Sequence, residues 1–211
     1  MTGPIPQPIL VWYVSYGSNM CADRLRCYLA GGVPAGARHG YSGCRDRQAP
    51  LRATGYRLAG GVYFATESAV WGGGRAFYDP DLPGTAATRA YLITSGQFAD
   101  IASQEMYRAT GADLDLTGVL AAGRAELGPG RYETLLHLGD LDGYPLLTFT
   151  ARWHAADVCW TAPSASYLRM LIAGLRETYG WTGCRIGSYL AGLPGARGHW
   201  TAADIAALLP P

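Results

Sequence analysis

The sequence predicts an α+β protein, because strand patterns dominate its middle and helical patterns dominate its last quarter. Short runs rich in β-branched and aromatic residues recur up to residue 94 and again over 132–150. From Pro163 onward, apolar residues recur at helical spacing. The strict alternation of strand and helix that is typical of a doubly wound parallel sheet is absent from this order.

The first half of the chain predicts four strands and two helices. One helix over 20–30 follows the first strand and ends at Gly31-Gly32. The other begins at Ser95 or Gly96, after the fourth strand, with apolar residues on one face. Each strand is a β-prone run bounded by turn-forming residues. The predicted strands are 9–14, 61–65, 75–78 and 88–94.

The second half begins with a mixed segment over 107–130 and a hairpin of strands 132–138 and 146–150. Three helices are expected after it: one from Pro163-Ser164 to Gly180, one over 182–191 and one over 202–209 that Thr201 caps. We therefore expect a single domain over 9–211. Its proline-rich leader is 1–8, its insertion is 107–130 and its C-terminal helical part is 163–209.

Composition narrows the function classes. The 211 residues are 49% hydrophobic and 16% charged, with a net charge of +1 and arginine as the only strongly basic residue type. This balance argues against non-specific binding to nucleic acid or to an acidic membrane. The N-terminus has no basic region typical of a signal peptide, and no apolar run approaches the roughly 20 residues of a membrane span. The oligomeric state stays open.

The cysteines favour a cytoplasmic location. They are five in number, which is odd, and no two are spaced as C-x-x-C. This pattern disfavours a disulfide framework and a structural zinc site. Reduced, buried thiols in a cytoplasmic protein are the simpler interpretation.

The first strand ends in Tyr16-Gly17-Ser18-Asn19-Met20. Such a loop turns several backbone N–H groups toward one point, which makes a cradle for a carboxylate or an oxyanion. Asn19 or Ser18 is also placed to cap the helix at Met20, adding side-chain donors and the positive end of the helix dipole. The alternative is an ordinary turn between a strand and a helix.

Glu105 is the glutamate set apart by its surroundings. It lies on the predicted apolar stripe with Phe98, Ile101 and Met106, so we expect it to be at least partly buried. Burial raises the pKa of a carboxyl group and suits it to proton transfer near neutral pH. The alternative is a glutamate at a helix end that pairs with Arg108.

Other site patterns are weak or missing. The histidines form no metal-binding spacing, and His154, Asp157 and Cys159 would face different sides of a strand. No serine-hydrolase elbow and no nucleotide-binding glycine loop are present. The run Trp71-Gly72-Gly73-Gly74 allows a close approach of backbone, or is simply a flexible hairpin connection. We therefore expect no metal and no cofactor.

Taken in order, these pieces resemble the γ-glutamyl cyclotransferase-like superfamily, which includes butirosin-type members. The resemblance covers roughly residues 11–192, and the Tyr16–Met20 loop is its most specific element. Glu105 follows that loop at a spacing of about 85 residues, which also fits the family. The resemblance implies a small mixed β-barrel with flanking helices, and a cofactor-independent reaction on a small-molecule γ-glutamyl substrate.

In the reaction that the resemblance implies, the substrate's own α-amine attacks the γ-carbonyl and releases an amine and 5-oxoproline. The resemblance makes Glu105 the acid/base, has Tyr16, Gly17, Ser18, Asn19 and Met20 bind the glutamyl group, and has Tyr132 help to fix the substrate. Two features depart from the family pattern. Met106 replaces the glycine that usually follows the catalytic glutamate, and the 107–130 insertion, with Asp113 and Asp115, would lie near the mouth of the site.

Two other functions remain open from the sequence. The same fold would also suit a non-catalytic module that binds a small acidic ligand in the loop. A metal-dependent amide hydrolase or deacetylase is disfavoured, because the sequence lacks the ligand clusters that it needs.

Overall fold

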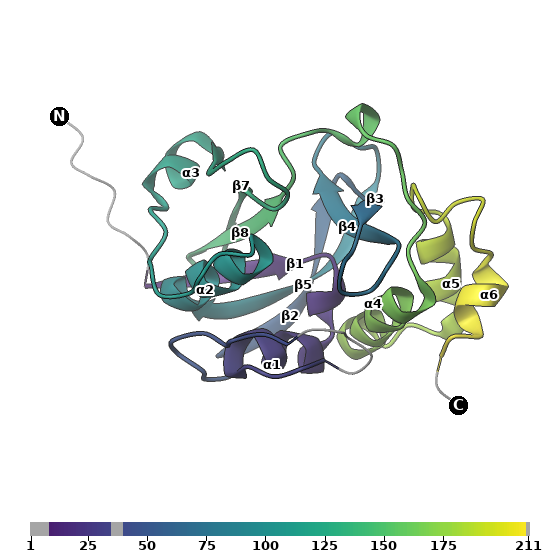
Figure 1. Cartoon of the computed structure of the whole chain (residues 1–211), viewed down its shortest axis with the longest axis horizontal. Coiled ribbons are helices and arrows are strands. Elements are labelled where there is room, and N and C mark those ends of the chain that lie inside the picture. The colour runs from purple at the N-terminus through teal and green to yellow at the C-terminus, as the bar shows by residue number, and fades with distance from the viewer. Residues whose placement is uncertain (1–8, 35–39, 210–211) are drawn as a thin grey trace.

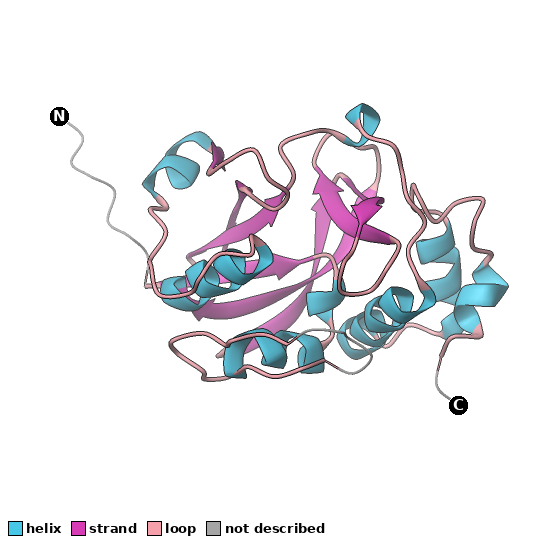
Figure 2. Cartoon of the chain, viewed as in Figure 1, coloured by secondary structure: helices cyan, strands magenta, loops and turns pink. Residues whose placement is uncertain are grey.

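The structure, a computed structural model, describes residues 9–34 and 40–209. Strands occupy the centre of the molecule and helices its periphery (Figures 1 and 2). The strands are β1 (Leu10–Ser15), β2 (Arg52–Ala59), β3 (Gly61–Glu67), β4 (Gly74–Asp79), β5 (Thr85–Thr94), β6 (Arg124–Glu126), β7 (Thr134–Leu141) and β8 (Tyr144–Thr150). The helices are α1 (Ala22–Ala30), α2 (Ser95–Glu105), α3 (Thr117–Ala122), α4 (Ala165–Tyr179), α5 (Gly183–Ala191) and α6 (Ala202–Ala206), with 3-10 turns η1 (Ser18–Met20) and η2 (Ala155–Asp157).

The sheet is open. Six strands pair in the order β2-β5-β1-β8-β7-β6, and β3 and β4 form a separate two-stranded sheet. Neighbouring strands are antiparallel except β1 and β8, which are parallel. The α+β class is confirmed, but the closed barrel that the resemblance implied is wrong. The edge strands β2 and β6 do not pair, so the six-stranded sheet does not close, and β3 and β4 pair only with each other.

Strand β1 lies at the centre of the sheet with both faces buried. Trp12 and Val14 face one core, which also contains apolar residues of α4, α5 and α6. Val11 and Tyr13 face a second core, built with α1, α2 and α3. A strand buried on both faces appears in sequence as a continuous apolar run, which is what precedes the Tyr16 loop.

Most predicted elements are confirmed, together with the residues that begin and end them. Thr94 and Gln97 form a capping box at the start of α2, and Ser164 and Thr201 cap α4 and α6. Gly180 ends α4 in the left-handed conformation. The structure adds three elements that the sequence patterns did not predict: strand β2, and α3 and β6 within the 107–130 segment.

Three expectations need correction or fall outside the structure. The helix predicted over 20–30 is divided into η1 and α1, and Cys21 separates them. The last helix ends at Ala206 rather than at residue 209. The proline-rich leader, residues 1–8, lies outside the described residues. Within the described residues, no helix is long and apolar enough to span a bilayer.

Helix α4 packs directly on the turn that follows β1. A Cβ atom on Gly174 would lie 2.5 Å from the Met20 Cβ and 2.8 Å from the Cys21 backbone nitrogen. Real Cβ atoms essentially never come this close to other heavy atoms. Glycine at this helix position therefore lets the backbone of η1 rest against α4, and this contact fixes the end of β1.

Replacing Gly174 by alanine tests this contact. Helix propensity alone would stabilise α4 by about 1 kcal/mol, but overpacking against the turn backbone costs about 1–3 kcal/mol. We expect the free energy of unfolding, measured by urea denaturation, to fall. The matched control is Gly118→Ala in α3, where nothing lies within 4 Å of the added Cβ and no loss is expected. A Gly174→Ala protein more stable than wild type would contradict the packing.

Candidate functional site

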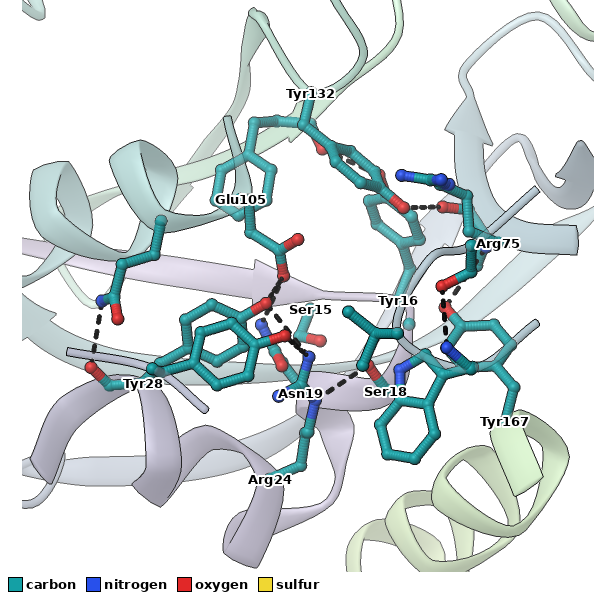
Figure 3. Close-up of a pocket in the computed structure, with 18 of the residues that line it drawn as sticks. Ser15, Tyr16, Ser18, Asn19, Arg24, Tyr28, Arg75, Glu105, Tyr132 and Tyr167 are labelled. Atoms are coloured by element: carbon teal, nitrogen blue, oxygen red, sulfur yellow. Dashed lines mark hydrogen bonds between the residues drawn. The ribbon is translucent and has the colours of Figure 1, made fainter. Parts of the chain in front are cut away.

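A cavity of about 60 Å³ opens where β1 ends (Figure 3). Its walls come from the turn after β1, from α1, from the end of α2 and from the β3–β4 hairpin, with single residues of β8 and α4. The structure brings six sequence-predicted site residues together in this lining: Tyr16, Gly17, Ser18, Asn19, Glu105 and Tyr132. Met20 is not part of the lining and packs under α4 instead.

The turn after β1 is a separate 3-10 turn rather than the first turn of α1. Gly17 precedes η1 and no side chain caps it, so the expectation that Ser18 or Asn19 caps the following helix is wrong. At η1, the Met20 N–H donates a hydrogen bond to the Gly17 carbonyl. The N–H groups at the start of such a turn have no partner within it, and the residues there, Gly17, Ser18 and Asn19, line the cavity.

Glu105 is the last residue of α2, and its neighbours in that helix fix its position. Asp100 is fully buried and pairs with Arg45 at 3.0 Å. The Gln104 amide donates to the Tyr28 carbonyl at 3.1 Å and accepts from the Gly43 N–H at 3.2 Å. These contacts attach the C-terminal turn of α2 to α1 and to the segment that follows it.

The Glu105 carboxylate faces the turn across the cavity. Its Oε1 accepts from the Tyr28 hydroxyl at 2.5 Å and from the Asn19 side-chain amide at 3.2 Å. The expected partial burial of Glu105 is confirmed. The alternative, an ion pair between Glu105 and Arg108, does not form, because Arg108 pairs with Glu133.

Residue 106 does not need to be glycine here. Met106 has φ −81°, which any residue adopts, and the left-handed residue is Tyr107, with φ +55°. Of the 107–130 segment, Tyr107 lines the cavity and Arg108 lines a wider hollow of about 300 Å³ beside it. Asp113 pairs with Arg45 and lies outside both linings. Asp115 is in neither lining, so the acidic residues of this segment do not form the mouth.

Arg24 is buried beneath the cavity among aromatic rings. Its guanidinium lies 4.4 Å from the Tyr41 ring centroid, 4.7 Å from Tyr28 and 5.4 Å from Trp71. It donates to the hydroxyls of Tyr28 at 3.1 Å and Tyr41 at 2.6 Å, and more weakly to Ser18 Oγ at 3.4 Å. Because Tyr28 accepts from Arg24, its own proton is directed to Glu105.

Two tyrosines hold one residue of β4 in place. The Tyr132 hydroxyl donates to the Ala76 carbonyl at 2.8 Å, and the Ala76 N–H donates to the Tyr167 hydroxyl at 3.2 Å. Because Tyr167 accepts the bond from Ala76, its own proton is available to a ligand. Tyr132 instead gives its proton to the backbone, and it has a left-handed φ of +61°.

Three buried side chains of the lining keep a polar atom without a partner among the described residues. The atoms are Asn19 Oδ1, Arg24 Nη1 and Arg75 Nε. Buried polar groups are normally paired, because an unpaired one costs free energy. The side chains of the cavity wall therefore contain one unpaired acceptor and two unpaired cationic donors.

The lining is poor in metal ligands. Glu105 is its only carboxylate, and neither histidine nor cysteine lines it in the part of the chain that the structure describes. Asp79, Asp81 and His154 do come within ligand distance of one another, but they lie outside this lining. Asp79 there accepts from the Ala155 and Asp81 N–H groups, so it already serves as a loop anchor.

Five important lining residues were not predicted from the sequence: Arg24, Tyr28, Tyr41, Arg75 and Tyr167. Arg24 and Tyr28 do carry a signal, since they lie four positions apart on one helix face. Arg75 carries one too, as a charge in the predicted strand 75–78, whose other residues are apolar or aromatic. Tyr167 lies among the residues that recur at helical spacing after Pro163, and nothing in its sequence surroundings indicates a site.

The tyrosines of the cavity keep their protons to high pH. Burial raises the pKa of Tyr167 to about 12 and, with the nearby Glu105 charge, holds the pKa of Tyr28 well above its usual range. Burial also raises the pKa of Tyr41. Each therefore acts as a hydrogen-bonding neutral phenol near neutral pH.

Alkaline unfolding should report these shifts. Unfolded tyrosine has a pKa of about 10, so above that pH the unfolded chain releases protons that the folded protein retains. The stabilisation is complete below pH 10 and is lost as the pH rises through the folded values. We expect the free energy of urea unfolding to fall above pH 10, together with a rise in tyrosinate absorbance. A free energy that stays constant to pH 12 would contradict this.

No family model matches the chain. Among curated proteins, it is 30% identical over 185 residues to a protein from Arabidopsis thaliana that is named histone deacetylase 5. That match covers 79% of this chain but only 28% of the plant protein's length. The deacetylase name therefore describes a protein of which this chain matches less than a third.

Two solved structures resemble this one along nearly their whole length. An uncharacterized protein from Homo sapiens has a TM-score of 0.53 at 15% identity, covering 95% of this chain and 99% of the human chain. A structure of a γ-glutamyl cyclotransferase has a TM-score of 0.52 at 13% identity, covering 94% and 98%. At such identities the likeness concerns the fold, and the chain has the γ-glutamyl cyclotransferase-like fold.

Proposed function

We propose that this protein cyclises a γ-glutamyl amide, releasing 5-oxoproline and a free amine without a cofactor. One observation carries the proposal. The Glu105 carboxylate lies across a small cavity from the Tyr16–Asn19 turn and receives hydrogen bonds from Asn19 and Tyr28. The likeness in fold to a γ-glutamyl cyclotransferase supports it.

The reaction suits a site of this size. The nucleophile is the substrate's own α-amine, and attack on the γ-carbonyl closes a five-membered ring. When the reacting groups are held at the right distance, effective molarities of order 10⁵ M or more are reached. The protein then has three tasks: to hold the glutamyl chain folded, to move a proton and to stabilise the oxyanion.

Glu105 is the proton carrier in this proposal. The α-ammonium would lie between the Glu105 carboxylate and the free Asn19 Oδ1, the unpaired acceptor of the lining. Glu105 takes a proton from the ammonium, which becomes the nucleophile, and returns a proton to the leaving amine. The Tyr28 hydroxyl fixes the carboxylate, and Arg24 fixes Tyr28.

The oxyanion would form between η1 and α4. The donors there would be the Tyr167 hydroxyl, whose own oxygen accepts the Ala76 N–H, and backbone N–H groups of the turn, whose residues Gly17, Ser18 and Asn19 line the cavity. The leaving amine would extend into the wider hollow, which shares Tyr41, Val70, Gln104 and Tyr107 with the cavity. The substrate's variable part thus has more room than its glutamyl part.

Replacing Glu105 by glutamine tests the proton carrier. General acid–base catalysis contributes about 10²- to 10⁴-fold, so we expect kcat for 5-oxoproline release from γ-glutamyl-alanine to fall at least about 100-fold. The control is Glu126→Gln, which removes an exposed carboxylate of β6 and should leave the rate unchanged. If Glu105→Gln keeps the full rate, Glu105 is not the acid/base. Binding of γ-glutamyl compounds without any turnover by the wild-type protein would favour a binding module instead.

Replacing Tyr167 by phenylalanine tests the oxyanion donor. Loss of one such donor costs about 10²- to 10³-fold in kcat, whereas KM should change little because the charge develops in the transition state. Tyr179→Phe is the matched control, because it removes a hydroxyl from the same helix that bonds to Tyr56 and Thr88 outside the cavity. If the Tyr167→Phe enzyme has an unchanged kcat, Tyr167 is not the oxyanion donor.

A further inference from the structure

Arg75 is a buried cation for which the described part of the chain supplies no anion. It is 8% exposed in β4, a strand that is buried at every position. Its Nη2 donates to the Glu67 carbonyl, and its Nε is buried without a partner. No carboxylate lies within ion-pair distance of it in residues 9–34 and 40–209. Burying a guanidinium in this way is costly unless an anion joins it.

The position of Arg75 is fixed from both sides. The next residue, Ala76, is held through its N–H by Tyr167 and through its carbonyl by Tyr132. On the other side, the Gly74 N–H donates to the Ala162 carbonyl at 2.7 Å, and a Cβ on Gly74 would lie 2.0 Å from the Thr161 oxygen. The sequence-predicted close approach of backbone at this glycine run is therefore confirmed.

The carbonyl that accepts from Arg75 is also placed by an irregular backbone. Strands β3 and β4 shift register between Ala65 and Glu67, and Thr66 at that point has φ +53°. A β-branched residue in this region is strained. The shift places the Glu67 carbonyl against the guanidinium. A strained turn and two tyrosine clamps thus hold one cation in the wall of the cavity.

Arg75 and Glu105 occupy different parts of the cavity wall. Figure 3 shows the Arg75 side chain beside Tyr132, away from Glu105 and from the Asn19–Tyr28 group. The positive charge of Arg75 acts on the Tyr132 hydroxyl, opposing the rise in its pKa that burial causes. Arg75 lines the cavity but not the wider hollow. Arg75 therefore lies outside the hollow into which the leaving amine would extend.

We propose that Arg75 binds the α-carboxylate of the γ-glutamyl group and so selects substrates that carry one. This inference rests on the proposed function. In a γ-glutamyl amide, the α-carbon carries both the ammonium assigned to Glu105 and a carboxylate. With the ammonium at Glu105 and the leaving amine toward the hollow, the α-carboxylate faces the remaining end of the cavity. There it would satisfy the free Arg75 Nε.

The experiment uses three amides that differ by one carboxylate. They are γ-glutamyl-alanine, 4-aminobutanoyl-alanine, which lacks the α-carboxylate, and γ-glutamyl-ethylamine, which lacks the carboxylate of the leaving amine. Release of the lactam, 5-oxoproline or 2-pyrrolidinone, is measured for the wild type, Arg75→Met and Arg75→Lys. The control Arg52→Met removes an exposed arginine of β2 that pairs with Asp142.

We expect Arg75→Met to lower kcat/KM by about 10- to 100-fold for both γ-glutamyl compounds, the range for one hydrogen bond to a charged group. The 4-aminobutanoyl compound should change by less than about twofold, because it has no carboxylate at that end. Arg75→Lys should restore part of the loss, and Arg52→Met should behave as wild type. An equal loss on all three compounds, or a loss confined to γ-glutamyl-alanine, would overturn the proposal.

Failure of this inference can be told apart from failure of the proposed function. If the wild type turns over all three compounds equally well, the proposed cyclisation is supported and the Arg75 assignment is wrong. This outcome needs only the wild-type protein, so it can be read even if the Arg75→Met variant does not fold. If the wild type releases no lactam, the proposed reaction fails. The Arg75 assignment is then decided by calorimetric titration of the wild type with 5-oxoproline, which carries the carboxylate, and with 2-pyrrolidinone, which lacks it. Tighter binding of 5-oxoproline supports the assignment. Equal binding of the two compounds, or no binding of either, overturns it.

Discussion

The candidate site depends on the hydrogen bonds that Asn19 and Tyr28 donate to Glu105. These bonds join the turn after β1, helix α1 and the end of α2, three segments that are far apart in the sequence. A carboxylate held by two donors has a defined orientation, and this one stands in the cavity wall beside the turn. Without this contact, the end of α2 and the turn would be two unrelated surface features.

The surrounding fold keeps those segments in position by close packing. Helix α4 presses on the Met20–Cys21 backbone through Gly174, and β4 presses on residues 161–162 through Gly74. Each glycine lacks a side chain at a position where a neighbouring backbone packs against it. Tyr167 and Tyr132 then connect α4 and the start of β7 to Ala76. The cavity wall is therefore continuous although it is assembled from distant segments.

Much of the fold could be predicted from the sequence because its elements have clear limits. Thr94, Ser164 and Thr201 begin helices and Gly180 ends one, as their residue types indicate. Glu105 could be singled out because a carboxylate on an apolar helical stripe is unusual. The open sheet could not be foreseen, since whether β3 and β4 close the barrel depends on pairing between distant strands.

The other residues of the site could not be predicted from local sequence patterns. Arg75 and Tyr167 come from separate segments, and only the folded chain shows that Tyr167 bonds to Ala76, next to Arg75, and that both residues line one cavity with the turn. Tyr28 likewise gains its role from α2, which is more than 70 residues away in the sequence. Local periodicity identifies the buried face of a helix or strand but does not say which buried polar groups meet.

The most direct test of the central claim is a crystal structure of the Glu105→Gln protein with γ-glutamyl-alanine bound. We predict that the glutamyl group lies inside the cavity, with its α-nitrogen roughly 3 Å from the residue 105 side chain and its γ-carbonyl oxygen roughly 3 Å from the Tyr167 hydroxyl. A ligand bound outside the cavity, or one whose α-nitrogen points away from residue 105, would contradict it.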